Sequence, residues 1–304
     1  MPDKSETVLV KVENRQLRLS NLNKVLYPQE GITKGEVIEY YTRVAPVLLP
    51  HLTGRPLTTI RFPNGTSGHK FFEKNVPRGA PSWVRTVRLP VPGSTMKRDE
   101  IDYIVADDLP TLVWLANLAA LELHVPQWRV GPRGGMHGAD QLVFDLDPGP
   151  PAGLEECAVV AIELRAALQQ DGLEPVAKTS GSKGMQLTAP IEASPPGRTS
   201  DYAKQLAERL EAELPKLVVS QMAKAVRAGR VFIDWSQNNP AKTTVAPYSL
   251  RGKEAFTASA PLHWDELSDG HLRQLTGTEV LARIESDGDL YEGALSDAAR
   301  ASLP

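Results

Sequence analysis

The sequence of 304 residues is 41% hydrophobic and 23% charged and carries a formal net charge of −3, which is the composition of a folded globular protein. Its single cysteine, Cys157, excludes an internal disulfide and fits a reducing, cytoplasmic compartment. The N-terminus lacks the apolar segment of a signal peptide. The most apolar stretch, residues 109–125, contains Asn117 and Glu122 and is too short to cross a membrane.

The charge is distributed unevenly along the chain. Residues 1–98 hold 16 Lys and Arg against 7 Asp and Glu, whereas residues 99–304 hold 18 against 30. Segment 223–253 is basic again, and Asp234 is its only acid. Such asymmetry indicates a polyanionic partner, although a solvated basic face is the alternative.

The N-terminal segment contains a candidate anion site. Residues 8–19 alternate apolar and polar side chains and predict strands. Residues 33–36, Thr-Lys-Gly-Glu, have the form of a capping box and predict a helix to about residue 50. Lys34 then lies in the first turn, where free backbone N–H groups favour an anion, and Lys24 adds a second charge nearby. A solvated lysine is the alternative.

Two adjacent aromatic residues follow among basic ones. Phe71 and Phe72 stand between Arg61, Lys70 and Lys74. Adjacent residues of a strand point to opposite faces, so both phenylalanines cannot face one core. An exposed aromatic ring among basic residues is typical of a surface on which nucleic-acid bases stack. Burial of the two rings on two separate faces is the alternative.

The next segments predict loops and one helix. Residues 76–98 are rich in Pro and Gly and predict loops and short strands. Asp108 predicts the start of an apolar helix that reaches about residue 123. His124 follows, and on spacing alone a single His is a structural residue. A glycine-rich loop is expected at residues 129–140, before the next strand.

Three acids indicate a metal site. Residues 143–149, Val-Phe-Asp-Leu-Asp-Pro-Gly, predict a strand that ends in a turn. Asp145 and Asp147 then share one face, about 7 Å apart. Carboxylates this close repel each other unless a cation lies between them. Asp234 lies in a further β-branched and aromatic run, and three strand-borne carboxylates can hold two divalent ions for phosphoryl transfer. The alternative is a strand end with solvated acids.

The remaining pattern predicts a mixed α/β fold. Helices are expected at 154–170, 201–214 and 220–228, and strands at 175–179 and 231–235. The turn 179–184, Thr-Ser-Gly-Ser-Lys-Gly, has small residues and a lysine that let backbone N–H groups approach phosphates, although it lacks Walker spacing and could be a plain turn. The element order places the three acids on neighbouring strands of one sheet.

Five stretches carry a family resemblance: LELHVPQW, VFDLDPG, TSGSKGMQL, FIDWSQN and KTTVAPYSLRG. Together they resemble the polymerase domain of bacterial ligase D, a family of the archaeo-eukaryotic primase superfamily that acts in non-homologous end joining. The resemblance covers nearly the whole chain. It implies a primase-polymerase fold of class α+β, with mostly antiparallel central sheets flanked by helices and the active site in a cleft.

The resemblance also implies a domain organisation and an activity. One domain would cover residues 1–304, with a basic DNA-binding region at about 1–100, a catalytic core at about 101–253 and an acidic segment at 254–304. The activity would be template-directed addition of ribonucleotides, and less well of deoxyribonucleotides, to DNA 3′ ends with two Mn²⁺ or Mg²⁺ ions. The implied partners are gapped or broken DNA with a 5′-phosphate, NTP or dNTP, bacterial Ku and a DNA ligase.

By position, the resemblance assigns roles to individual residues. The implied metal-binding and catalytic residues are Asp145, Asp147 and Asp234. The implied nucleotide-binding residues are His124, Ser180, Lys183 and Arg251. The implied pocket for a downstream 5′-phosphate contains Asn21, Lys24 and Lys34. The implied template-stacking pair is Phe71 and Phe72. Basic and polar positions beside the active site are Lys224, Arg227 and Gln237.

Two other functions are compatible with parts of the pattern. The motif VFDLD is similar to the Asp-x-Asp motif of haloacid dehalogenase phosphatases, although Pro148 and Gly149 depart from it. A non-catalytic module that bridges DNA ends would keep Lys24 and Lys34 but would have no use for three aligned acids. No Lys-x-Asp-Gly ligase motif is present, so we expect an excised domain or a stand-alone polymerase.

Overall fold

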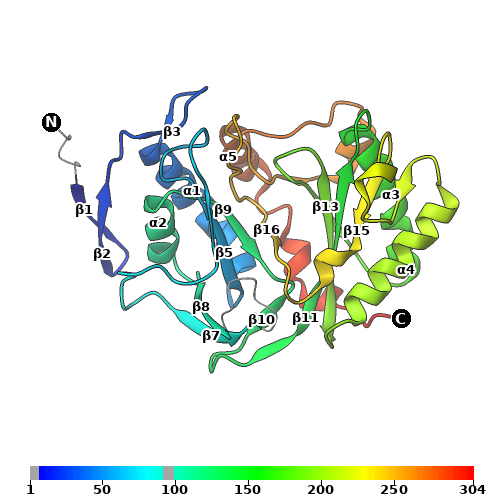
Figure 1. Cartoon of the computed structure of the whole chain (residues 1–304), viewed down its shortest axis with the longest axis horizontal. Helices are drawn as coiled ribbons and strands as arrows, with labels where there is room; N and C mark the ends of the chain where they lie inside the picture. The colour runs from blue at the N-terminus through cyan, green and yellow to red at the C-terminus, as the bar shows by residue number, and fades with distance from the viewer. Residues whose placement is uncertain (1–6, 92–98) are drawn as a thin grey trace.

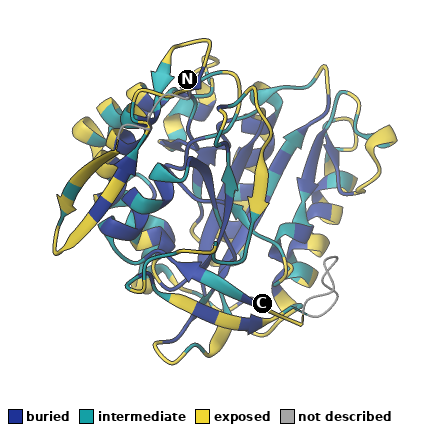
Figure 2. Ribbon diagram, turned by 60° about the vertical axis from the view of Figure 1, so that its left-hand side comes forward, coloured by how far each residue is buried: buried dark blue, intermediate teal, exposed yellow. Residues whose placement is uncertain are grey.

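A computed structural model describes residues 7–91 and 99–304. Two β-sheets stand side by side in the middle of the molecule, and helices lie on their outer sides (Figure 1). The strands of both sheets are mostly buried, whereas the hairpin near the N-terminus is largely exposed (Figure 2). This arrangement confirms the predicted mixed α/β class with mostly antiparallel sheets. The predicted loop region 76–98 lies partly outside the described residues.

The chain begins with two small ribbons and a long helix. Strands β1 (Thr7–Val12) and β2 (Arg15–Ser20) form the expected hairpin, and β3 (Val25–Tyr27) pairs with β4 (Ile32–Thr33). Helix α1 (Lys34–Leu52) follows directly. Its capping box is formed as predicted, since Thr33 and Glu36 bond each other's backbone N–H groups.

The first sheet is antiparallel and has the order β16-β9-β5-β8-β7, with β6 on β5. Its strands are β5 (Pro56–Arg61), β6 (Phe71–Glu73), β7 (Thr86–Pro90), β8 (Glu100–Val105), β9 (Ala120–Val125) and β16 (Thr244–Val245). Residues of α1 and of α2 (Leu109–Asn117) share one hydrophobic cluster with this sheet.

The helix expected to reach residue 123 is shorter, and this prediction was wrong. Helix α2 ends at Asn117, Ala119 adopts φ 58°, and His124 lies on strand β9. Pairing with β5 accounts for the change, because it buries Leu121 and Leu123 completely and gives the backbone sheet partners.

The second sheet has the order β14-β15-β11-β13-β12-β17, with β10 on the first part of β11. All its pairs are antiparallel except β14 with β15. Its strands are β10 (Trp128–Val130), β11 (Met136–Pro148), β12 (Val176–Thr179), β13 (Met185–Ser194), β14 (Val218–Val219), β15 (Val231–Asp234) and β17 (Pro261–Leu262). The loop expected at 129–140 is therefore confined to residues 131–135.

Helices α3 (Leu154–Gln170) and α4 (Arg198–Glu213) share the second hydrophobic cluster with Leu142, Phe144 and Leu146 of β11. Alternate residues of a strand face opposite ways, so Asp145 and Asp147 face away from these helices. The helix expected at 220–228 is a single 3-10 turn, Lys224–Val226, because the segment curves back over the turn after β11.

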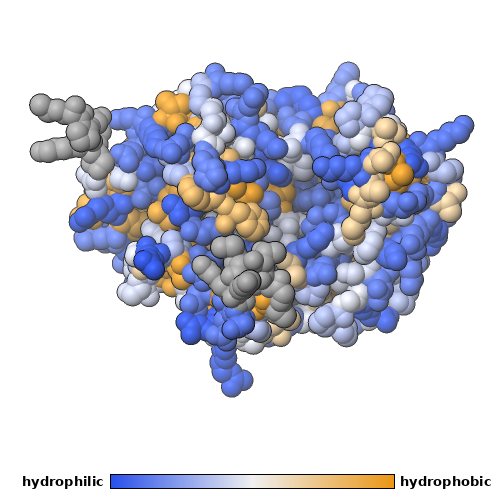
Figure 3. Space-filling model, viewed as in Figure 1, coloured by the Kyte–Doolittle hydropathy of each residue, from blue (hydrophilic) through white to orange (hydrophobic). Residues whose placement is uncertain are grey.

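The C-terminal segment contributes to both hydrophobic clusters. It contains α5 (Gly277–Asp287) and 3-10 turns at Trp264–Ser268, Glu292–Leu295 and Asp297–Ala299, and a further turn, Trp235–Asn238, follows β15. Phe256 and Tyr291 belong to the first cluster, whereas Leu267 and Leu303 belong to the second. None of the helices described is both long and apolar enough to cross a membrane. The face seen in Figure 3 is mainly hydrophilic, with scattered apolar patches.

Candidate active site

A pocket of about 250 Å³ lies where the two sheets meet. Strands β9 and β16 of the first sheet supply one wall, and strands β11 and β13 of the second sheet supply the floor. The lining residues are His124, Asp145, Asp147, Ser180, Ser182, Lys183, Gln186, Gln237, Thr243, Thr244, Val245 and Arg251. The pocket thus brings together the predicted nucleotide-binding residues, two of the three predicted acids and Gln237.

The third acid is a direct neighbour of the first. Asp145 on β11 and Asp234 on β15 are cross-strand partners, and Asp147 lies two residues further along the same face. Burial, followed by the charge of Asp147, raises the pKa of Asp145 to about 6. The three carboxylates therefore crowd one another on one face of the sheet.

Their side chains have other partners in this structure. Asp234 accepts hydrogen bonds from the Ser236 backbone and hydroxyl and, at 2.8 Å, from Gln237 Nε2. Asp147 Oδ1 lies 3.5 Å from Lys183 Nζ. Within residues 7–91 and 99–304, no three His, Cys, Asp or Glu side chains form a group that could hold a metal ion.

The chemistry of the three acids nevertheless fits a hard divalent cation. Carboxylate oxygens are the ligands that Mg²⁺ and Mn²⁺ prefer. Burial and then the charge of Asp147 raise the pKa of Asp145, so the ionised carboxylate is costly at this position without a further counter-charge. A cation would supply that counter-charge, and Lys183, with a side chain that is 61% exposed, can move away without breaking the fold.

The turn 179–184 is held tightly against strand β11. Ser180 Oγ accepts from the backbone N–H groups of Ser182 and Gly184, and Ser180 N donates to Gly184 O at 2.9 Å. A Cβ atom on Gly184 would lie 1.9 Å from the carbonyl oxygen of Leu146. The absence of a side chain at Gly184 therefore lets the backbone of the turn approach the strand between Asp145 and Asp147.

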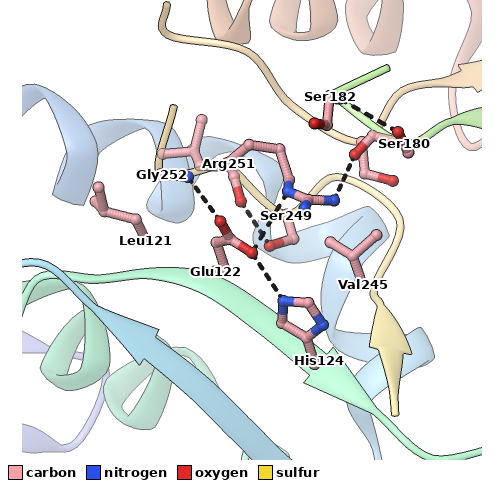
Figure 4. Close-up of polar contacts among 12 residues, drawn as sticks. Leu121, Glu122, His124, Ser180, Ser182, Val245, Ser249, Arg251 and Gly252 are labelled. Atoms are coloured by element: carbon pink, nitrogen blue, oxygen red, sulfur yellow. Dashed lines mark hydrogen bonds and ion pairs between the residues drawn. The ribbon is translucent and has the colours of Figure 1, made fainter. Parts of the chain in front are cut away.

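Glu122 links two predicted nucleotide-binding residues (Figure 4). Its Oε2 lies 2.9 Å from His124 Nε2 and 3.4 Å from Arg251 Nε, and its Oε1 accepts from Gly252 N at 3.0 Å. Arg251 in turn donates from Nη1 to the carbonyl of Ser180 at 2.7 Å. Although burial opposes it, the hydrogen bond from His124 and the charge of Arg251 lower the pKa of Glu122 to about 2. Burial lowers the pKa of His124, which favours the neutral ring.

Sequence reasoning missed several residues of the site. Because residue 122 was expected in a helix, its position beside His124 on one face of β9 was not predicted. Gln186 and Lys178 are also part of the site, because Gln186 donates to Asp145 Oδ1 at 3.0 Å and Lys178 donates to Gln186. Burial lowers the pKa of Lys178 to about 7. Their contacts depend on strand register, which the sequence pattern does not specify.

The residues of the predicted 5′-phosphate pocket lie close together beside α1. Lys24 Nζ donates to Asn64 Oδ1 at 3.0 Å, and Lys34 Nζ donates to Asn117 O at 3.1 Å. Asn21 is exposed in the preceding turn, where Lys24 N donates to its carbonyl. Burial and the charge of Lys24 lower the pKa of Lys34 to about 8.

The expectation of free backbone N–H groups in the first turn of α1 was wrong. Lys34 N donates to Lys24 O at 2.8 Å, Gly35 N donates to Leu22 O at 2.9 Å, and Glu36 N donates to Thr33 Oγ1. These donors are used to fold the preceding loop onto the helix. Binding of a phosphate would therefore depend on side chains.

Both predicted template-stacking residues are exposed. Phe71 and Phe72 on β6 are 49% and 63% exposed, so neither ring belongs to a core. His69 packs edge-on against Phe71, and Lys74 Nζ lies 5.9 Å from the centre of the Phe72 ring. The pair forms an aromatic surface with basic neighbours.

The predicted basic positions 224 and 227 lie outside the residues that line the pocket. Lys224 is exposed on the 3-10 turn. The Arg227 guanidinium stacks 3.7 Å from the centre of the Phe232 ring and donates to Met222 O. Arg227 thus holds its own loop against the sheet.

The fold, the family match and the solved structure reported below indicate a nucleotidyltransferase of the polymerase type, which sets aside both the phosphatase and the non-catalytic bridging module. A family model described as "LigD, primase-polymerase domain" matches residues 33–291. The chain therefore belongs to the LigD primase-polymerase domain family, as the five sequence stretches indicated.

Individual relatives agree with this membership. The "Multifunctional non-homologous end joining protein LigD" of Mycolicibacterium smegmatis is 44% identical over 284 residues, which cover 93% of this chain and 36% of that protein. The "Bifunctional non-homologous end joining protein LigD" of Bacillus subtilis is 33% identical over 276 residues, 90% of this chain and 43% of that protein. The chain thus spans less than half the length of these relatives.

A solved structure shares the fold closely. It is described as the polymerase domain from Mycobacterium tuberculosis Ligase D in complex with DNA. The two structures superpose with a TM-score of 0.89 at 44% sequence identity, over 96% of this chain and 100% of that one. The predicted primase-polymerase fold is therefore confirmed.

Proposed function

We propose that the chain adds nucleotides, ribonucleotides in preference to deoxyribonucleotides, to DNA 3′ ends opposite a template during non-homologous end joining. The observation that supports this is the pairing of Asp145 with Asp234 beside a pocket that also contains His124, Ser180 and Arg251. Transfer of a nucleotidyl group requires acids on one side of the pocket and phosphate-binding groups on the other.

Asp145, Asp147 and Asp234 would hold two Mn²⁺ or Mg²⁺ ions. When bound, such ions favour deprotonation of the attacking hydroxyl and neutralise charge on the transferred group. The chain holds the three carboxylates on adjacent strands of a buried sheet, which keeps them in place during the reaction.

The triphosphate would lie along the turn 179–184 and Arg251. Arg251 is held in place by Glu122 and by the Ser180 carbonyl, so its guanidinium is oriented before the nucleotide binds. Lys183 would leave Asp147 for a phosphate oxygen. With its Nε2 directed to Glu122, His124 would present Nδ1 to the nucleotide.

The DNA would extend from this pocket over the N-terminal half. Phe71 and Phe72 would stack on template bases, and Asn21, Lys24 and Lys34 would bind a downstream 5′-phosphate. Lys224, Arg227 and Gln237 would lie beside the primer end. In the cell, Ku and a DNA ligase are the proposed partners, in line with the printed function of the LigD relatives.

Primer extension tests this proposal. The substrate is a gapped duplex with a 5′-phosphate, supplied with NTP or dNTP and with Mn²⁺ or Mg²⁺. We expect wild type to extend the primer with NTP, and Asp145→Asn or Asp147→Asn to lose at least 100-fold in rate while DNA binding stays within twofold, since loss of a catalytic metal ligand removes several kcal/mol of stabilisation. Asp269→Asn is the control, because it changes an exposed carboxylate that is distant in sequence from the three acids. Near wild-type extension by Asp145→Asn would refute the proposed metal site, and a clear dNTP preference would refute the ribose preference.

A further inference from the structure

Four polar side chains form a row across the second sheet at the floor of the pocket. Asp145 is the register partner of Asp234 on one side and of Gln186 on the other, and Gln186 is in turn the partner of Lys178. Directly opposed residues project from the same face of a sheet. The row therefore runs from two carboxylates through a carboxamide to an ammonium group on strand β12.

Lys178 is buried and held from three directions. Only 2% of the residue is exposed. Its Nζ donates to Gln186 Oε1, to Val245 O at 3.1 Å and to Ser259 Oγ at 2.7 Å. An ammonium group has three hydrogens, so each has an acceptor. The Nζ position is fixed by β16 of the first sheet and by the C-terminal segment as well as by its own sheet.

The ammonium group determines how Gln186 is oriented. A carboxamide has an acceptor on one side and donors on the other. With Oε1 engaged by Lys178, Nε2 points to Asp145 and donates to Oδ1 at 3.0 Å. The reversed amide would place an oxygen against the carboxylate and two donors against the ammonium, and both contacts would be repulsive.

We propose that Lys178 is a positioning residue for Asp145: it orients the Gln186 amide so that Asp145 Oδ1 is hydrogen-bonded and Oδ2 stays available for a divalent cation. This inference rests on the proposed role of Asp145 as a metal ligand. Partners that orient a metal ligand in this way affect metal affinity by roughly 10- to 100-fold.

Simple electrostatics predicts the opposite effect of removing Lys178 on cation affinity. The direction of the measured change therefore distinguishes the two explanations. With a pKa of about 7, Lys178 is positively charged in a substantial fraction of molecules at neutral pH, and it lies near a proposed site for a cation. If it acted through its charge alone, removing that charge would strengthen cation binding. If it acts by orienting Gln186, removing it weakens cation binding.

The test is direct titration of the full chain with Mn²⁺, followed by the electron paramagnetic resonance signal of free Mn²⁺. Lys178→Met has similar length and no donors, and Gln186→Met removes the amide. We expect each to weaken Mn²⁺ binding about tenfold, and the double variant to be no weaker than the single variants, because both act through one hydrogen bond. Lys216→Met, an exposed lysine, is the control and should bind as wild type does.

Binding by Lys178→Met that is equal to or tighter than wild type would overturn the proposal, as would a double variant about 100-fold weaker than wild type. Thermal unfolding monitors whether each variant folds. Should Lys178→Met not fold, Lys178→Gln keeps a donor without the charge. Binding of Mn²⁺ tighter than wild type by Lys178→Gln overturns the proposal, and equal or weaker binding supports it.

Asp145→Asn separates this inference from the proposed function. If Asp145→Asn binds Mn²⁺ as tightly as wild type, the proposed metal role of Asp145 fails. If Asp145→Asn binds weakly and Lys178→Met binds normally, the metal role stands and only the positioning role of Lys178 fails.

Discussion

The Glu122 carboxylate is shared by three residues from two segments of the chain. His124 on its own strand, and Arg251 and Gly252 from the segment after β16, all approach it. Because the pKa of Glu122 lies at about 2, the carboxylate stays charged at neutral pH. Its charge keeps the Arg251 guanidinium in a site that would otherwise be costly for a cation.

We predict that Glu122→Gln weakens nucleotide binding. The amide keeps the size of the side chain but removes the charge that orients Arg251 and His124. A charge-assisted contact contributes about 1.5–3 kcal/mol, or roughly ten- to a hundredfold in affinity. We expect KM for the nucleotide to rise by such a factor, with a smaller change in kcat. Glu208→Gln, in a surface pair with Lys204, is the control. An unchanged KM would show that Arg251 and His124 do not need Glu122.

Lys34 predicts a pH dependence of DNA binding. Its pKa of about 8 means that the ammonium is charged at pH 7 and mostly neutral at pH 9 in the free protein. A lowered lysine pKa removes positive charge as pH rises, so preference for a 5′-phosphate over a 5′-hydroxyl should be larger at pH 7 than at pH 9. Paired titrations of the two duplexes at both pH values measure this. In Lys34→Ala the pH effect should vanish; a preference in wild type that is equal at both pH values would contradict the argument.

Single residues were predicted with uneven success. Asp145, Asp147 and Asp234 could be identified from strand alternation and residue type alone, and the structure brings them onto one face. Gln186 and Lys178 could not, because their importance comes from cross-strand partners that alternation does not reveal. The role of residues such as Gln186 and Lys178 becomes apparent only when the strand register is known.

At the scale of elements, the turn 179–184 and strand β11 are in such close contact that a methyl group cannot fit between them. The Cβ of an alanine at position 184 would lie 1.9 Å from Leu146 O. The turn would have to move away from the strand that carries Asp145 and Asp147. The residues proposed to bind phosphate and those proposed to bind metal would then separate.

We therefore predict that Gly184→Ala lowers the rate of nucleotide addition at least tenfold and lowers stability by about 1–3 kcal/mol, the usual range for overpacking. Gly135→Ala is the control, because a Cβ there meets no atom within 4 Å and the position has no positive φ. Extension rates and thermal unfolding of the two variants are compared. Wild-type activity of Gly184→Ala would show that the turn can move without harm.

Elements were predicted best where local signals were strong. The capping box at residues 33–36 and helix 154–170 were found within one or two residues. The end of α2 was misplaced, because residues 118–123 are apolar in a way that suits a helix and a buried strand equally. Pairing with β5 decides between them, and that contact is remote in sequence.

At the scale of the whole molecule, the proposed DNA site and the proposed catalytic site are built from different elements. Lys24 and Lys34 lie beside α1, whereas the acids lie on the second sheet. The basic N-terminal third predicted this division in outline. The exact boundaries at residues 100 and 253 stay predictions, and the first sheet takes strands from both sides of residue 100.

We predict that Lys24→Ala combined with Lys34→Ala removes the preference for a 5′-phosphate without affecting the metal site. The two charges contribute roughly ten- to a hundredfold in affinity at low salt, and the wild-type preference should shrink as salt rises. Binding to phosphate and hydroxyl gaps is compared at two salt concentrations, with Lys204→Ala as the control. If the double variant keeps the full preference, the phosphate binds elsewhere. Extension of a primer without a downstream strand should remain normal.

The shortness of strand β16 has a consequence for local stability. Its two residues, Thr244 and Val245, form one wall of the pocket and pair only with β9 among the described strands. Because two register pairs form a short ladder, we expect this wall to open locally more readily than the long strands of the second sheet. A nucleotide that binds only when this wall is closed stabilises the closed wall by its binding free energy. Amide hydrogen exchange at Val245 and Ala246 should therefore slow as nucleotide concentration rises, while exchange at the centre of β11 stays unchanged.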